Sequence, residues 1–166
     1  MPNQYRLVRV DRRTFELRDS DASVAATIDF VGSNRAMIEA GKERFSLVRS
    51  GFLTPSLILR DESANGRLIA RGSCSGAYRM QDGGLSWRAL SFRRGTYGWT
   101  TSGGSAVIRY APLSPWNSSD AIVTVEQEIA DELRLIAIGA FLLKLTRDDV
   151  SVVLAVTAAA TAISMA

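Results

Sequence analysis

The chain has 166 residues, 46% of them hydrophobic, and a formal net charge of +3, which is typical of one globular domain with a sizeable core. The absence of histidine removes the commonest general base and the commonest zinc ligand, and the single cysteine, Cys74, excludes an intrachain disulfide. Charge is unevenly spread, because residues 1–119 carry 17 basic and 10 acidic side chains whereas residues 120–166 carry 3 and 7. All of the 20 basic residues except Lys42 and Lys144 are arginine, which favours bidentate contacts with carboxylate or phosphate.

The N-terminal stretch MPNQYRLVRVDRR contains no apolar segment of signal-peptide length. We therefore expect a cytoplasmic protein rather than one secreted through a signal peptide.

The first 126 residues show short runs separated by turn residues, a pattern that is typical of an all-β protein. Apolar and polar residues alternate in short runs such as Phe45–Arg49, and turn pairs such as Asn65-Gly66 supply the positive φ angles of tight hairpins. Many short strands at close spacing favour a sandwich or a barrel. The expected strands are Gln4–Val10, Thr14–Asp19, Ser23–Phe30, Arg35–Ala40, Glu43–Arg49, Ser56–Arg60, Arg67–Gly72, Gly76–Met80, Leu85–Phe92, Thr96–Thr100, Ala106–Tyr110 and Ala121–Glu126.

The segment Leu135–Leu143 is apolar on every face of a helix, so it must be buried on all sides. It is roughly 14 Å long, well short of the ~30 Å needed to cross hydrocarbon. Burial inside a closed β-structure is therefore the favoured interpretation. The acidic residues before it complement the positive end of a helix dipole, which predicts a helix over 128–146. These acidic residues are Glu126, Glu128, Asp131 and Glu132.

A second helix is expected at 149–165, with Asp148 or Asp149 as its N-cap. Residues 150–166 carry no charged side chain and span roughly 25 Å, which borders on membrane length. This additional apolar helix makes 147–166 a separate unit after residues 1–146. Three uses of the helix remain open. Residues 149–166 mediate self-association or dock a partner, or residues 150–166 anchor the protein in a membrane as a tail.

Twelve or so antiparallel strands followed by the run Leu133–Leu143, with its Ile-Gly-Ala and aromatic-aliphatic sequence, resemble the tubby-like C-terminal superfamily. That superfamily includes the tubby domain, the phospholipid scramblases and the LURP-one-related proteins. The resemblance implies a closed antiparallel barrel of about 12 strands around a central hydrophobic helix over 1–146, and a binding module rather than an enzyme. The acidic calcium-binding segment of scramblases is not matched, because residues 119–125 contain one carboxylate.

No catalytic, cofactor-binding or metal-binding residues are predicted. The Cys74 thiol, between serines and a glycine, is expected in a turn. The aromatics between positions 87 and 116 are interleaved with arginines, a composition found at membrane interfaces and in aromatic rows that line a barrel wall. Four arginines are the candidate contacts for anionic head groups. They predict a protein that is peripheral to a membrane and binds anionic phospholipid. Nucleic acid is not favoured as a partner. The four arginines are Arg88, Arg93, Arg94 and Arg109.

Overall fold

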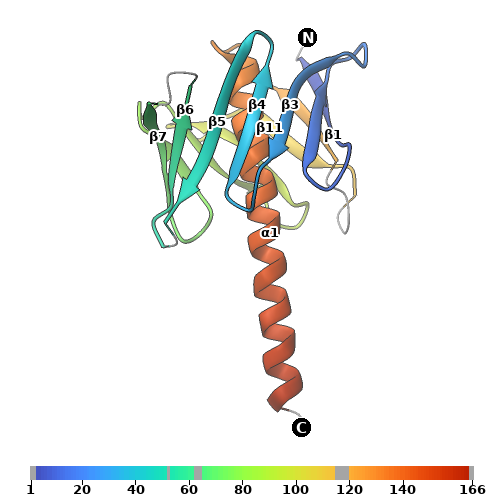
Figure 1. Ribbon diagram of the computed structural model, residues 1–166, viewed down its shortest axis with the longest axis vertical. Coiled ribbons are helices and arrows are strands. Elements are labelled where there is room, and N and C mark those ends of the chain that lie inside the picture. Colours follow the sequence, from blue (N-terminus) through green and yellow to red (C-terminus); the bar gives the residue numbers. More distant parts are fainter. Residues whose placement is uncertain (1–2, 52, 62–64, 115–119, 165–166) are drawn as a thin grey trace.

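The structure is a computed structural model that describes residues 3–51, 53–61, 65–114 and 120–164, of which 149–164 are described by their backbone alone. Twelve antiparallel strands follow one another around a closed barrel, and β1 closes it by pairing with both β2 and β12 (Figure 1). The predicted fold class, a mainly β protein with a closed antiparallel barrel around a hydrophobic helix, is thereby confirmed. The strands are β1 Gln4–Arg9, β2 Thr14–Arg18, β3 Val24–Phe30, β4 Arg35–Ala40, β5 Glu43–Ser50, β6 Ser56–Arg60, β7 Gly66–Gly72, β8 Tyr78–Met80, β9 Leu85–Ser91, β10 Thr96–Thr101, β11 Ala106–Pro112 and β12 Ala121–Val125.

The helix α1, Glu132–Ser164, enters the barrel at one end, fills its interior and leaves through the other end (Figure 1). Its apolar segment Leu135–Leu143 is buried throughout. Phe141 stacks on Phe30 of β3 with ring centroids 5.5 Å apart. Alternating strand residues such as Phe15 and Leu17 supply the inner wall, so the barrel is a packed core rather than a pore.

One continuous helix replaces the two that the sequence predicts, so the expected break at Asp148–Asp149 is wrong. The carboxylate of Asp148 accepts from the Lys144 ammonium one turn earlier, at 2.5 Å, which is the geometry of a helix interior and not of an N-cap. Neither glycine nor proline occurs between position 140 and the last residue, so no residue there breaks the helix. The uses expected of residues 149–166, namely self-association, docking of a partner and membrane anchoring, depend on side chains that lie outside the described residues.

The helix also begins later than predicted, at Glu132 instead of position 128. Asp131 has a φ of 55°, a left-handed conformation that a helix cannot include. Glu132 accepts a hydrogen bond from the Tyr5 hydroxyl at 2.8 Å, and Arg134 pairs with Glu43 at 2.9 Å. Burial and the Glu132 carboxylate raise the pKa of Tyr5 to about 12. These contacts tie the start of α1 to the strands around it.

Two buried tryptophans line the barrel beside α1, and their indole N–H groups differ in hydrogen bonding. Trp99 Nε1 donates to the backbone oxygen of Leu135 at 3.1 Å, whereas Trp87 Nε1 has no partner among the described residues. We expect Trp99→Phe to lower the free energy of unfolding by about 1–2 kcal/mol more than Trp87→Phe, because only the first change loses a hydrogen bond and leaves a buried carbonyl with one partner fewer. Urea unfolding of both variants measures the difference. Equal losses would contradict the assignment.

Candidate functional site

Because neighbouring strands alternate in direction, six of the loops lie at the end of the barrel where α1 leaves it. We call this the exit end, and a Cβ on Gly76 in one of its loops would lie 4.0 Å from Thr146 of α1. The six loops are 10–13, 31–34, 51–55, 73–77, 92–95 and 113–120, with position 52 and residues 115–119 outside the described part. The remaining loops form the opposite end, where α1 begins.

The structure divides the four predicted arginines between two places. Arg88 of β9 and Arg109 of β11 flank Gly98 of β10 on the outer wall. Arg109 Nε lies 3.3 Å from a carboxylate oxygen of Glu126, and Arg88 donates to the backbone oxygen of Gly104 at 3.2 Å. This wall pair therefore already has partners within the protein.

Arg93 and Arg94 instead lie in the turn between β9 and β10, at the exit end. Phe92, which precedes them, is 88% exposed. Among the described residues, no side-chain group interacts with either guanidinium. Both side chains are therefore available to an external anion.

A second pair of arginines at the exit end, Arg12 and Arg13, lies in the loop between β1 and β2. The Asp11 carboxylate accepts from the backbone N–H of Arg13 at 2.7 Å and of Thr14 at 2.9 Å, and these bonds lower its pKa. The Asp11 carboxylate is thus hydrogen-bonded to the backbone of its own turn. Arg12 and Arg13 are exposed, with no side-chain partner among the described residues. We call Arg12, Arg13, Arg93 and Arg94 the loop arginines.

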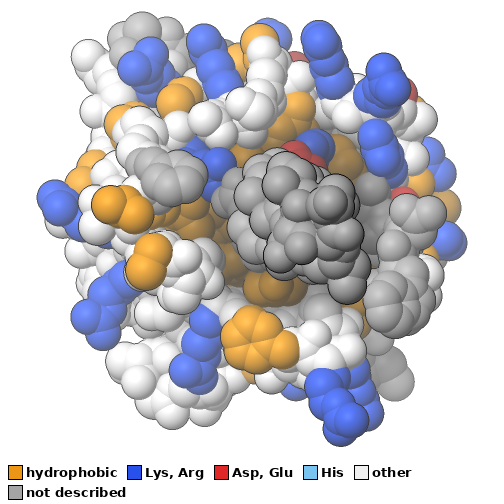
Figure 2. Space-filling model, turned by 90° about the horizontal axis from the view of Figure 1, so that it is seen from below, with side chains coloured by type: hydrophobic (Ala, Val, Ile, Leu, Met, Phe, Trp, Pro, Cys, Tyr) orange, Lys and Arg blue, Asp and Glu red, His pale blue; other side chains and the backbone are white. Residues whose placement is uncertain are grey.

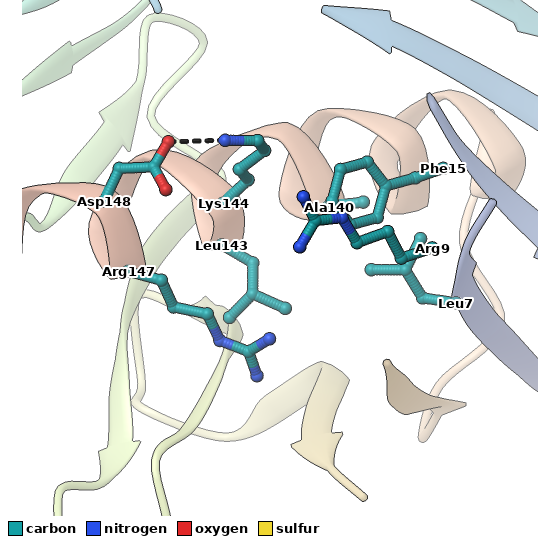
Figure 3. Close-up of a pocket in the computed structure, with 8 residues that line it drawn as sticks. All are labelled: Leu7, Arg9, Phe15, Ala140, Leu143, Lys144, Arg147 and Asp148. Carbon is teal, nitrogen blue, oxygen red and sulfur yellow. Dashed lines mark hydrogen bonds and ion pairs between the residues drawn. The ribbon is translucent and has the colours of Figure 1, made fainter. Parts of the chain in front are cut away.

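A cleft of about 100 Å³ opens at the exit end between α1 and the first two strands. Figure 3 shows the side chains of Arg9 of β1 and Arg147 of α1 on either side of Leu143. Lys144 and Asp148 complete the charged rim. The cleft therefore combines three cations and one carboxylate with an apolar floor, which is made by Leu7, Phe15, Ala140 and Leu143.

Two of the three cations of the cleft, Lys144 and Arg147, are partly removed from water, whereas Arg9 is exposed. Burial lowers the pKa of Arg147, although a guanidinium remains charged at neutral pH. Lys144 lies 4.9 Å from the ring centroid of Phe30 while its ammonium pairs with Asp148. Partly desolvated cations attract an anion more strongly than fully solvated ones. The cleft thus presents partly desolvated positive charge beside an apolar floor.

A second hollow lies on the outer wall across β4, β5 and β6. Its rim also carries arginines, namely Arg35, Arg44 and Arg60, together with Asp61. The Arg44 guanidinium lies 3.4 Å from a carboxylate oxygen of Glu39, so part of this positive charge is balanced inside the protein. On the described surface, this hollow is the alternative to the exit end as a location for a bound anion.

Sequence reasoning missed most of the exit-end cations. The sequence contains two pairs of adjacent arginines, Arg12-Arg13 and Arg93-Arg94, but nothing in it brings the two pairs together. Lys144 and Arg147 follow the apolar segment, where cations complement the negative end of a helix dipole, so the sequence offers an ordinary reason for both. Trp116, among the predicted aromatics, lies outside the described residues, while Trp87, Trp99 and Tyr110 line the interior.

Comparison of the chain with models of protein families, with curated proteins and with solved structures gives no match. The resemblance to the tubby-like superfamily therefore stays a prediction. Within the helical residues whose side chains are described, no segment is long and apolar enough to cross a membrane.

Proposed function

We propose that the protein is a non-enzymatic binding module of the tubby, scramblase and LURP-one-like type that contacts anionic phospholipid at a membrane surface. The observation that supports it best is the set of four loop arginines, which are exposed at one end of the barrel without side-chain partners among the described residues. The cleft beside them adds Arg9, Lys144 and Arg147 over an apolar floor. Guanidinium groups bind phosphate, as they bind carboxylate, in bidentate geometry.

The two ends of the barrel differ in charge. Among the described loop residues, the exit end carries the four loop arginines against Asp11 and Asp120. The opposite end carries Lys42 against seven carboxylates, which are Asp19, Asp21, Asp61, Asp82, Glu126, Glu128 and Asp131. An anionic surface attracts the first end and repels the second. This charge difference orients the barrel on such a surface, at about 1 kcal/mol for each basic residue that reaches it.

Sedimentation with vesicles tests the proposal. We expect the protein to sediment with vesicles of phosphatidylcholine and phosphatidylserine at low salt, and much less with phosphatidylcholine alone. Binding to the anionic vesicles should weaken as salt is raised, because exposed charges are screened beyond about 10 Å at 0.1 M salt. Equal, negligible binding to both kinds of vesicle would refute the proposed function.

A further inference from the structure

We infer that the exit end is a membrane-inserting surface, whose loop tips enter the interface of an anionic bilayer while the barrel stands above it. The inference rests on the proposed function and extends it, because it assigns the contacting face, the mode of contact and the orientation. It is carried by the position of the exposed hydrophobic side chains, which the charges alone do not explain.

Large exposed hydrophobic side chains gather at the exit end. Seven such residues are found among the described residues, and five of them lie in exit-end loops. Each of these five belongs to a different loop, so they form a ring around the emerging helix rather than one patch. Their exposed fractions are 52% for Val10, 58% for Val31, 69% for Leu53, 88% for Phe92 and 44% for Leu113.

This arrangement fits a bilayer better than a protein partner. A protein interface is built around a contiguous buried centre, with hot spots clustered there. Here the five hydrophobic side chains project from separate loops around α1. Figure 2 shows hydrophobic side chains interspersed with Lys and Arg side chains on the face around the helix. A fluid, flat surface can accept several separate tips at one depth, and arginine stems can lie along the apolar layer while their guanidinium groups reach head-group phosphates.

Within the described part of the chain, the opposite end lacks this combination. Val24, which is 51% exposed at the start of β3, is the large exposed hydrophobic residue that the described part places there. It lies beside a loop that contains Asp19 and Asp21. The helix α1 leaves the barrel through the middle of the exit end and continues away from the strands, so its backbone over 149–164 extends beyond the tips on the same side (Figure 1).

The single cysteine provides a probe without any change to the tips. Cys74 is exposed in the exit-end loop 73–77, and labelling it with an environment-sensitive fluorophore such as NBD places the dye beside the tips. The full chain is mixed with vesicles of phosphatidylcholine and phosphatidylserine that carry nitroxide on their acyl chains. We expect the NBD emission to rise several-fold without nitroxide and to be quenched with it. The same dye at position 42, in a Cys74→Ser, Lys42→Cys variant, should remain in water.

Matched substitutions test the tips themselves. Phe92→Ser together with Leu53→Ser should lower the partition coefficient into these vesicles about tenfold or more, because two apolar side chains no longer leave water. Val24→Ser, at the opposite end, should leave it unchanged. The two variants and the unchanged chain should unfold at similar urea concentrations, since the substituted side chains are exposed.

The outcomes separate the two proposals. Protein that sediments with anionic vesicles while the dye on Cys74 stays unquenched would overturn membrane insertion and leave the proposed function standing. Quenching at position 42, or equal partition of the Phe92, Leu53 variant and the unchanged chain, would likewise overturn it. Absence of sedimentation by the unchanged chain would overturn both.

Discussion

Gly139→Ala is expected to destabilise the protein by about 3 kcal/mol, although alanine is favoured over glycine by about 1 kcal/mol in an ordinary helix interior. Gly139 lies in α1 where two aromatic side chains reach the helix backbone. A Cβ there would be under 3 Å from the Tyr110 hydroxyl and from Trp99 Nε1. Tyr110 donates to the Ile136 oxygen at 2.8 Å, and Trp99 to the Leu135 oxygen. The added methyl therefore displaces both donors from their acceptors.

Urea unfolding measures this loss, and two further variants locate its cause. Gly32→Ala should be close to neutral, because nothing lies within 4 Å of a Cβ at that position. Tyr110→Phe removes the atom nearest to the new methyl, so the alanine should cost at least about 1 kcal/mol less in that background. A Gly139→Ala protein as stable as the unchanged chain would show that the helix does not pack against β10 and β11 as described.

Replacing the four loop arginines by glutamine should reduce the preference for anionic over neutral vesicles by roughly a hundredfold or more, given about 1 kcal/mol for each basic residue at an anionic surface. The measured quantity is the ratio of the two partition coefficients at low salt. That ratio is insensitive to any apolar contact that the rest of the chain makes with both kinds of vesicle. Neutralising exposed arginines should leave the unfolding transition nearly unchanged.

A matched variant removes the same charge elsewhere on the barrel. Glutamine at Arg6, Arg44, Arg60 and Arg67 neutralises four exposed arginines on the wall and toward the opposite end, two of them at the rim of the outer hollow. We expect it to retain most of the anionic preference. A larger loss in this variant than in the loop-arginine variant would place the lipid contact on the barrel wall and contradict the proposed face.

Local sequence patterns predict the elements of this fold well because each pattern has a local cause. Alternation of apolar and polar residues selects strands, and residues such as Gly41, with a φ of 60°, end them in tight turns. All twelve predicted strands occur, with bounds that differ by a few residues. Leu135–Leu143 is buried as predicted, because an all-apolar helix of that length has no stable position outside a core.

The errors arise where a local signal competes with its neighbours. Asp148 has the side chain of an N-cap, yet the ammonium of Lys144 one turn earlier uses its carboxylate and the helix continues. At the other end of α1, the acidic residues from Glu126 onward indicate a helix start. Instead the backbone N–H of Glu126 donates to the Val107 oxygen, and the left-handed Asp131 delays the helix.

The candidate site shows the limit of sequence reasoning more sharply. Arg93 and Arg94 were predicted as head-group contacts from their aromatic surroundings, and they are exposed at the exit end. Arg88 and Arg109 were predicted on the same grounds, but the register of β9, β10 and β11 places them on the wall. Closeness in the sequence therefore does not distinguish the exposed pair, Arg93 and Arg94, from the wall pair, Arg88 and Arg109.

Local patterns in the chain are enough to select the class of structure, namely about twelve strands and a buried helix, and the composition excludes histidine and an intrachain disulfide while supplying many arginines. Periodicity and composition act over a few residues, and a few residues suffice to select a strand, a turn or an apolar helix. Which loops share an end of the barrel depends instead on how the strands are arranged in space. Closure of the antiparallel barrel brings alternate hairpins, from Val10 to Leu113, to the place where α1 leaves, and so gathers arginines and hydrophobic tips that lie far apart in the chain.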